Sequence, residues 1–248
     1  MSLASSLRPD SNAAVIGASG GIGRAFVELL AGDARVRRVH ACCRVPGEWA
    51  QDKVVSHRLD LTDEGSIEAA AAAASDNAPL DLVIVATGIL YRGERIRPEK
   101  AMREIDPENL AEVLAVNSIG PSLVAKHFLP KLRRDNKAVF AALSARVGSI
   151  GDNRLGGWTA YRMSKAALNM LVRTMAIEQA RSAPESVVVA LHPGTVDTGL
   201  SKPFTGRVPA TQLFKPGVAA TRLLGVLDTL WPDQTGGFFA YDGTRIEF

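Results

Sequence analysis

The sequence predicts an α/β protein whose core is a doubly wound, parallel β-sheet of about seven strands with helices on both faces. Three observations predict this fold class. Short apolar runs alternate with longer helical segments, several of the runs are almost continuously apolar, and a glycine-rich turn follows the first run. Continuous apolar runs are typical of strands buried on both faces, and the intervening helices supply the crossovers that a parallel sheet needs. We expect residues 1–248 to form one domain, because no repeat, low-complexity tract or linker divides them.

The first half of the chain supplies four of the expected strands and two helices. Residues 13–16 form the first apolar run, and the helix expected at 21–31 carries apolar residues on one side. An alanine-rich helix at 63–75 ends where Asp76 and Asn77 interrupt it. The expected strands of this half are residues 13–16, 38–43, 54–59 and 80–86.

The second half supplies the remaining helices and strands. Pro107 begins a helix that leads through Asn117 into a long apolar helix ending near Arg134, since proline is favoured in a first helical turn. Another long helix is expected at 158–181 and a last one at 216–230. The expected strands are residues 138–143, 186–191 and 237–241.

Composition narrows the classes of function. The chain is 46% hydrophobic and 22% charged, which is ordinary for a globular protein, and its net charge is +3. The densest basic group, residues 35–38, has no interleaved aromatic residues, so a solvated face is favoured over nucleic-acid binding. No run reaches the ~20 apolar residues of a membrane span, and residues 1–10 lack the apolar core of a signal peptide. Adjacent Cys42 and Cys43 lack zinc-site spacing. We therefore expect a cytoplasmic protein with no membrane, metal or nucleic-acid partner.

The turn after the first strand has the pattern of a phosphate-binding site. It reads Gly17-Ala18-Ser19-Gly20-Gly21-Ile22-Gly23 and opens the first helix. Gly17 suits a tight turn, Gly21 lets the backbone approach a pyrophosphate, and Gly23 lets the helix pack against the strand. The helix N-terminus then offers free N–H groups to the phosphates. The alternative is an ordinary glycine-rich turn, but the strand–turn–helix context favours a dinucleotide.

Tyr161 and Lys165 form a candidate catalytic pair on the helix at 158–181. They are four residues apart, so their side chains leave one helix face about 5–6 Å apart at Cβ. A free phenol has a pKa of about 10, and a nearby ammonium favours the phenolate by roughly 3 kcal/mol at an effective dielectric near 20. We expect Lys165 to lower the pKa of Tyr161 toward useful proton transfer. Packing at a helix interface is the alternative role for the tyrosine.

These two motifs resemble those of the short-chain dehydrogenase/reductase family. Gly-x-x-x-Gly-x-Gly replaces the Gly-x-Gly-x-x-Gly of many dehydrogenases, and Tyr-x-x-x-Lys belongs to the same family. The resemblance covers nearly the whole chain and implies a Rossmann-like fold. The longer stretch between Ser144 and Tyr161, together with the ending at residues 236–243, is similar to the C-factor-like and small carbonyl-reductase-like branch.

The resemblance implies a catalytic tetrad. Ser144 follows the fifth strand, as the family's catalytic serine does, and Asn117 resembles the asparagine that kinks a helix and orders a relay water. Tyr161 would donate the proton, Lys165 would assist it and hold the nicotinamide ribose, and Ser144 would bind the carbonyl oxygen. Separately, each of these residues could instead have a structural role such as capping a loop or bonding the backbone.

The resemblance also implies where the coenzyme lies. The segment at 86–88 resembles the family's Asn-Asn-Ala-Gly motif, although both asparagines are replaced, by Val85 and Ala86. Asp60 and Leu61 would flank the adenine. Pro193 and Gly194, after the sixth strand, would close over the nicotinamide. The expected coenzyme-binding residues are Gly17, Ser19, Gly21, Ile22, Gly23, Arg44, Asp60, Leu61, Ala86, Thr87, Gly88, Tyr161, Lys165, Pro193, Gly194, Val196 and Thr198.

The end of the second strand favours NADP(H) over NAD(H). An NAD-binding member carries an acid about 20 residues past the glycines, where it bonds the ribose 2′-hydroxyl. Cys43 falls at that position and Arg44 follows it. A guanidinium can hold a 2′-phosphate through paired hydrogen bonds, which an acid would repel. The alternative is that Arg44 is a solvated loop residue.

The expected function is NADP(H)-dependent hydride transfer between a carbonyl (aldehyde or ketone) and an alcohol. The alternative is an NADP(H)-binding signalling or regulatory protein with little turnover, which the altered segment at 85–88 favours. A nucleotide-sugar epimerase would need a larger substrate domain than the residues after Pro193 supply.

Loops at about 146–158 and 195–215 are expected to frame a small-molecule substrate, although the first could be a surface insertion without a role. Arg92, Arg146 and Arg154 suggest an anionic or polar substrate, with surface solvation as the alternative. By resemblance, the helices at 118–134 and 158–181 would form the interface of a homodimer or homotetramer, unless they show only their sheet-facing cores.

Overall fold

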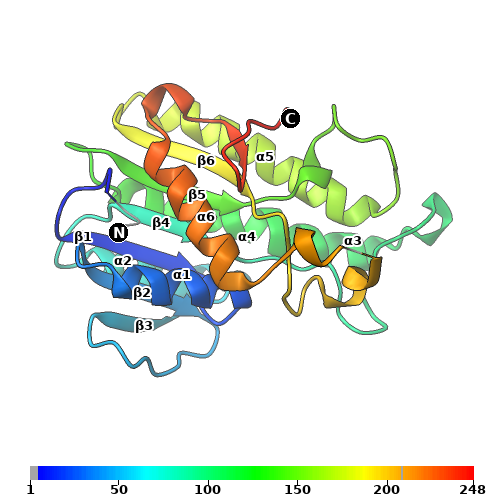
Figure 1. Cartoon of the computed structure of the whole chain (residues 1–248), viewed down its shortest axis with the longest axis horizontal. Helices are drawn as coiled ribbons and strands as arrows, with labels where there is room; N and C mark the ends of the chain where they lie inside the picture. The colour runs from blue at the N-terminus through cyan, green and yellow to red at the C-terminus, as the bar shows by residue number, and fades with distance from the viewer. Residues whose placement is uncertain (1–4, 208) are drawn as a thin grey trace.

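The computed structural model describes residues 5–207 and 209–248, and its centre is a seven-stranded parallel sheet (Figure 1). The strand order is β3-β2-β1-β4-β5-β6-β9, and every neighbouring pair is parallel. The prediction of a doubly wound parallel sheet is confirmed. The strands are β1 Ser11–Ile16, β2 Val36–Cys43, β3 Val54–Arg58, β4 Leu82–Val85, β5 Ala138–Leu143, β6 Ser186–His192 and β9 Phe238–Ala240.

Helices cover both faces of this sheet. Figure 1 shows α1 and α6 in front of the strands, and their apolar residues form one core with the sheet. On the other face, α2, α4 and α5 form a second core. A shorter helix, α3, packs against α5, and β7 Thr195–Val196 pairs with β8 Leu213–Phe214 in a separate small sheet. The helices are α1 Gly21–Gly32, α2 Glu64–Ser75, α3 Pro107–Leu114, α4 Gly120–Phe128, α5 Thr159–Gln179 and α6 Pro216–Thr229.

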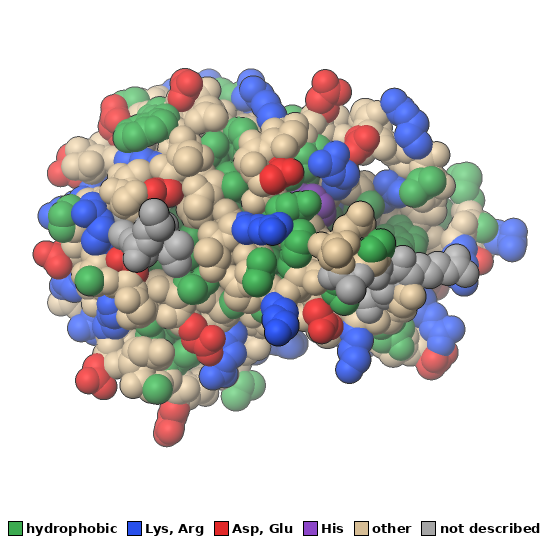
Figure 2. Space-filling view, viewed as in Figure 1, with side chains coloured by type: hydrophobic (Ala, Val, Ile, Leu, Met, Phe, Trp, Pro, Cys, Tyr) green, Lys and Arg blue, Asp and Glu red, His purple; other side chains and the backbone are tan. Residues whose placement is uncertain are grey.

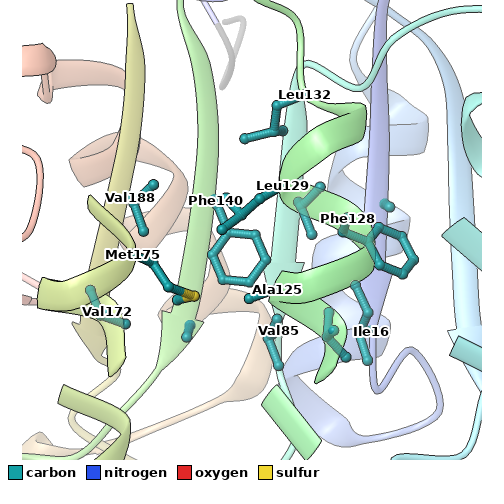
Figure 3. Close-up of a cluster of buried hydrophobic side chains, with 14 of the residues drawn as sticks. Ile16, Val85, Ala125, Phe128, Leu129, Leu132, Phe140, Val172, Met175 and Val188 are labelled. Atoms are coloured by element: carbon teal, nitrogen blue, oxygen red, sulfur yellow. The ribbon is translucent and has the colours of Figure 1, made fainter. Parts of the chain in front are cut away.

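The two cores explain why the strands read as continuous apolar runs. Successive side chains of a strand point to opposite faces, so Val15 joins the core under α1 and α6, whereas Ile16 joins the core under α2, α4 and α5. Figure 3 shows this second core, in which Phe128 and Phe140 lie among aliphatic side chains from the sheet and from α4 and α5. Both phenylalanine side chains are fully buried.

The strand order determines where a ligand can bind. The chain winds outward from β1 to β3 and then returns to place β4 on the other side of β1. In such sheets the ligand crevice lies at the carboxyl ends of the strands where this reversal occurs. The glycine turn after β1 and the segment after β4 therefore come together at one edge.

One helix is several residues shorter than predicted, and the predicted kink has a specific geometry. The helix expected to end near Arg134 ends at Phe128 as α4, and a 3₁₀ turn follows at Leu129–Lys131, because Pro130 has no N–H to continue the α-helical ladder. The kink predicted at Asn117 is a π-helical turn, Ala115–Ile119, between α3 and α4.

Acidic and basic side chains are interspersed on the face of the molecule seen in Figure 2. Across the described residues, no helix is long and apolar enough to cross a bilayer.

Candidate active site

A cavity of about 530 Å³ lies at the carboxyl ends of the central strands. It receives residues from the turn before α1, the ends of β4, β5 and β6, and the start of α5. The predicted residues that line it are Gly21, Ile22, Ala86, Thr87, Gly88, Ser144, Tyr161, Lys165, Pro193, Gly194, Val196 and Thr198. The predicted residues outside its lining are Gly17, Ser19, Gly23, Arg44, Asp60, Leu61 and Asn117. A second cavity of about 530 Å³, beside Leu132 and Arg133, contains none of the predicted residues.

The glycine turn has the close backbone approaches that its sequence suggested. Gly17 has a φ of +87°, and a Cβ there would lie 2.8 Å from Cγ2 of Thr87. A Cβ on Gly23 would lie 2.1 Å from the carbonyl oxygen of Gly17, so only glycine lets α1 pack this close. Among the described residues, no side chain caps the N-terminus of α1, which leaves its first N–H groups free for an anion. These features fit a dinucleotide phosphate.

Tyr161 and Lys165 are both buried and both line the cavity. Nζ of Lys165 donates a 2.8 Å hydrogen bond to the carbonyl oxygen of Leu143 and lies 5.8 Å from the centroid of the Tyr161 ring. Burial lowers the pKa of Lys165 to about 8. Burial also raises the pKa of Tyr161 above its ordinary value, which is opposite in direction to the lowering that we expected from Lys165. In this structure, desolvation therefore outweighs the attraction of the ammonium.

Asn169, a residue that the sequence motifs did not indicate, holds Ser144 in the same cavity. The hydroxyl of Ser144 donates a 2.6 Å hydrogen bond to Oδ1 of Asn169, and Nδ2 of Asn169 donates to the carbonyl oxygen of Gly148 at 3.2 Å. Asn169 is buried on α5, four residues beyond Lys165. The sequence signal that could have identified it is an amide four residues beyond Lys165, on the same helix face as Tyr161 and Lys165.

Asn117 does not line the cavity, but its side chain links two parts of the site. Its Oδ1 accepts a hydrogen bond from the backbone N–H of Ile89, and its Nδ2 donates to the carbonyl of Ile89 and to Oγ of Ser164. Ser164 lies between Tyr161 and Lys165 in sequence. Asn117 therefore connects the segment after β4 to the helix that carries the candidate proton donor.

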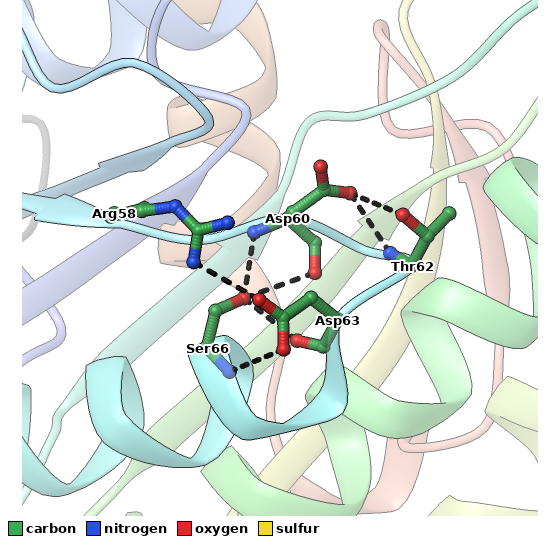
Figure 4. Close-up of polar contacts among 5 residues, drawn as sticks. All are labelled: Arg58, Asp60, Thr62, Asp63 and Ser66. Atoms are coloured by element: carbon green, nitrogen blue, oxygen red, sulfur yellow. Dashed lines mark hydrogen bonds and ion pairs between the residues drawn. The ribbon is translucent and has the colours of Figure 1, made fainter.

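The predicted adenine and 2′-phosphate residues lie beside the ends of β2 and β3. Figure 4 shows the carboxylate of Asp60 bonded to Oγ1 and the backbone N–H of Thr62, at 2.8 and 3.0 Å. These hydrogen bonds lower the pKa of Asp60, and the charges of Arg44 and Arg58 act in the same direction. Arg58 bonds Asp63, whereas the exposed guanidinium of Arg44 makes no hydrogen bond or ion pair within residues 5–207 and 209–248.

Hydrogen bonds hold the enlarged loop at 146–158 against the start of α5. The guanidinium of Arg162 donates to the carbonyl oxygens of Val147, Gly156 and Gly157 at 2.9–3.2 Å. The buried Glu99 accepts from the N–H of Ala160 through its carboxylate. Glu99 and Arg162 were not singled out from the sequence. They hold both ends of the loop against the start of α5.

Trp158 gives the cavity an aromatic wall at the end of this loop. It has a left-handed φ of 54°, and its backbone N–H donates to the carbonyl oxygen of Glu99 at 2.5 Å. The indole lies 5.2 Å from the ring of Phe204 and 6.4 Å from the ring of Tyr161, between centroids. Phe204 comes from the second expected substrate loop, at 195–215, of which residue 208 is outside the described residues.

A family model described as short chain dehydrogenase matches residues 11–207. The chain is a member of the short-chain dehydrogenase/reductase family. Its oxidoreductase relatives include 1-hydroxy-2-glutathionyl-2-methyl-3-butene dehydrogenase of Rhodococcus sp. (strain AD45), which is 31% identical over 96% of this chain and 100% of the relative.

Two further similarities bear on the branch of the family. C-signal of Myxococcus xanthus is 38% identical over 59% of this chain and 82% of its own length. The crystal structure of NADPH-bound carbonyl reductase from chicken fatty liver superimposes with a TM-score of 0.82, at 31% identity, over 98% of this chain and 100% of that one. The predicted resemblance to C-factor-like and carbonyl-reductase-like members is confirmed.

Proposed function

We propose that this oxidoreductase interconverts a carbonyl and an alcohol by hydride transfer with NADP(H), using Ser144, Tyr161, Lys165 and Asn117. The observation that carries the proposal is the meeting of a phenol, a hydroxyl and an ammonium in one cavity whose other side is the glycine turn. A bound nicotinamide supplies or accepts the hydride. The protein must then supply only a proton, a place for the developing oxygen charge and an orientation for the substrate.

Tyr161 is the proposed proton donor in carbonyl reduction. Because burial raises its pKa, the phenol holds its proton at neutral pH, as a donor must. Transfer of that proton to the substrate oxygen leaves a phenolate, which costs less when an ammonium is close by. Lys165 provides this positive charge below its pKa of about 8, and its bond to the carbonyl of Leu143 holds Nζ in place.

Ser144 is the proposed partner of the carbonyl oxygen. Its Oγ is held by Asn169, and rotation about the Cβ–Oγ bond can turn the hydroxyl hydrogen from Asn169 toward the substrate without moving Oγ. A donor positioned in advance stabilises the negative charge that develops on the oxygen. Asn117 is proposed to hold the water that returns a proton to Tyr161 through Lys165, as the family resemblance implies.

Arg44 supports NADP(H) as the preferred coenzyme. Its exposed guanidinium is free to pair with a 2′-phosphate. The matched chicken carbonyl reductase is described as NADPH-bound, which favours the same coenzyme for this chain.

A second candidate is an NADP(H)-binding regulatory protein with little turnover. The similarity to C-signal favours it, as does the replaced motif after β4. In that segment the hydroxyl of Thr87 is enclosed without a hydrogen-bond partner among the described residues. The presence of all four proposed catalytic residues favours the enzyme.

We also propose that the protein forms a homodimer or homotetramer through α4 and α5. Met163, Met170 and Ile177 are exposed on α5 and lie seven residues apart, which places them in one stripe. Light scattering after size-exclusion chromatography tests this; a monomer at micromolar concentration would refute it.

The proposed function is tested by incubating the purified protein with NADPH or NADH and a panel of aldehydes, ketones and quinones. Oxidation of NADPH that depends on both protein and carbonyl supports a reductase. Tight NADPH binding with no turnover of any member, and no reverse reaction on the matching alcohols, would favour the regulatory alternative.

A further inference from the structure

His192, which the proposed mechanism does not use, stands next to Ser144 at the carboxyl end of the sheet. Leu143 of β5 is in register with Leu191 of β6, and the backbone N–H of Ser144 donates to the carbonyl of Leu191 at 2.7 Å. Ser144 and His192 are the next residues of these two strands. Neighbouring strands lie about 4.8 Å apart, and side chains in register leave the same face. His192 also lines the cavity that contains Ser144.

The imidazole of His192 offers a hydrogen-bond donor to this cavity. Its Nδ1 is enclosed and has no hydrogen-bond partner among the described residues. Its Nε2 also has no partner among them, but this nitrogen is not enclosed. A buried N–H without an acceptor is rare in proteins, so we assign the proton to Nε2, the nitrogen that is not enclosed. Burial and then the charge of Arg146 lower the pKa of His192 to about 4, against the opposing charge of Asp242. The ring is therefore a neutral donor at pH 7.

Arg146 adds a positive charge to the same part of the cavity. It lies in the 3₁₀ turn Arg146–Gly148, two residues after Ser144, and lines the cavity. Its Nη1 is 3.2 Å from a carboxylate oxygen of Asp152. A guanidinium has five N–H donors, so others stay available to a ligand. Leu90, Trp158, Leu200 and Phe204 give the same cavity an apolar wall.

We propose that His192 and Arg146 form a subsite for a substrate carboxylate, so that the preferred substrate is a 2-oxo acid with an apolar or aromatic side chain. This rests on the proposed function, because Ser144 and Tyr161 place the reacting carbonyl. The carboxylate of a 2-oxo acid is bonded to the reacting carbon, and a donor one strand away from Ser144 is placed to reach it. His192 and Arg146 thereby determine specificity while Tyr161 and Ser144 act on the carbonyl oxygen.

The test compares three substrates that share a phenyl group: benzoylformate, its methyl ester and acetophenone. The kcat/KM of each is measured with NADPH for the wild type and for Arg146→Gln, His192→Leu and His192→Gln. Arg154→Gln is the matched control, because Arg154 is an exposed arginine of the same loop that does not line the cavity. Thermal melting establishes that each variant is folded.

We expect the wild type to prefer benzoylformate to acetophenone by tenfold or more. Arg146→Gln should lower kcat/KM about tenfold for the acid and less than twofold for the other two, since only the acid is charged. His192→Leu should lower it about tenfold for the acid and the ester, and His192→Gln, which keeps a donor, should restore most of the loss. Equal losses for all three substrates, or an ester as good as the acid, would overturn the subsite.

Equilibrium binding separates this proposal from the proposed function. Calorimetry of benzoylformate with the NADP⁺-loaded protein at pH 5.5, in two buffers of different ionisation enthalpy, reports affinity and proton uptake without reaction, and turnover is measured separately with NADPH. Binding that needs Arg146 and takes up a proton through His192, but gives no turnover, would support the subsite and refute the reductase. Turnover of acetophenone without Arg146-dependent binding of the acid would support the reductase and refute the subsite.

Discussion

Ser144, the residue directly after β5, and Asn169 on α5 are joined by a 2.6 Å hydrogen bond from the serine hydroxyl to the asparagine oxygen. Through this bond, the helix that carries Tyr161 and Lys165 also sets the position of the serine. Tyr161, Lys165 and Asn169 follow one another at intervals of four residues, so a single helix face orients all three polar groups of the site.

Asn169→Ala should weaken catalysis through loss of this orientation. The variant leaves the Ser144 hydroxyl and the Gly148 carbonyl without their partner. A serine hydroxyl that is no longer held in position stabilises less of the charge on the substrate oxygen, so we expect kcat to fall about tenfold or more with the NADPH Kd unchanged. Steady-state kinetics and NADPH fluorescence titration measure the two quantities. Asn77→Ala, at an exposed position beyond α2, is the control; an unchanged kcat for Asn169→Ala would refute the positioning role.

Arg44→Ala should change coenzyme preference without changing the chemistry. If the guanidinium bonds the 2′-phosphate, its loss removes a charge-assisted contact that NADH never makes. We expect the Kd of NADPH to rise about 10-fold to 100-fold and that of NADH to change less than threefold. Arg37→Ala, an exposed arginine of β2, serves as control. Tighter binding of NADH than NADPH by the wild type would contradict the preference.

The histidine pair between β2 and β3 should make stability fall in acid. Nε2 of His40 bonds Oδ1 of Asn12 at 3.0 Å, and its Nδ1 lies 2.8 Å from Nε2 of His57. Burial, with the charge of His57, lowers the pKa of His40 to about 3. Because this folded pKa is below the unfolded value of about 6.5, the stabilisation is complete above pH 6.5 and is lost as the pH falls toward 3.

Urea unfolding followed by circular dichroism at pH 7 and pH 4.5 measures this effect. We expect the free energy of unfolding to drop by about 2–3 kcal/mol from His40 alone, with other groups adding their own contributions. His40→Gln should flatten this slope, whereas Asn77→Gln, at an exposed position outside the pair, should leave it unchanged. The same slope in wild type and His40→Gln would refute the assignment.

Local patterns made much of the fold predictable. A short, continuous apolar run between two helical segments is typical of a buried strand, and β5 has the bounds predicted from such a run, residues 138–143. The glycine turn was predictable because its geometry requires glycine: a Cβ at Gly23 would collide with the carbonyl oxygen of Gly17. Helix ends were harder to predict. Residues 118–134 were expected to form one helix, but α4 ends at Phe128 and Pro130 lies in the 3₁₀ turn that follows.

The supporting residues of the site were not predictable in the same way. Glu99 acts on Trp158 and Ala160 from a loop about 60 positions earlier in the sequence, and His192 gains its meaning only from the register of β6 with β5. Nothing in the local sequence encodes such distant contacts. Likewise, the pKa of Tyr161 depends on its burial as well as on Lys165, and burial was not visible from their spacing.

The most direct test of Tyr161 as the proton donor is the turnover of Tyr161→Phe beside wild type on a carbonyl that the wild type reduces. Phenylalanine keeps the ring and its packing but has no proton to transfer. We expect kcat to fall about 100-fold to 10,000-fold, in line with the loss of a general acid, while the Kd of NADPH changes less than threefold. A Tyr161→Phe variant with kcat within a few-fold of wild type would contradict the proposed mechanism.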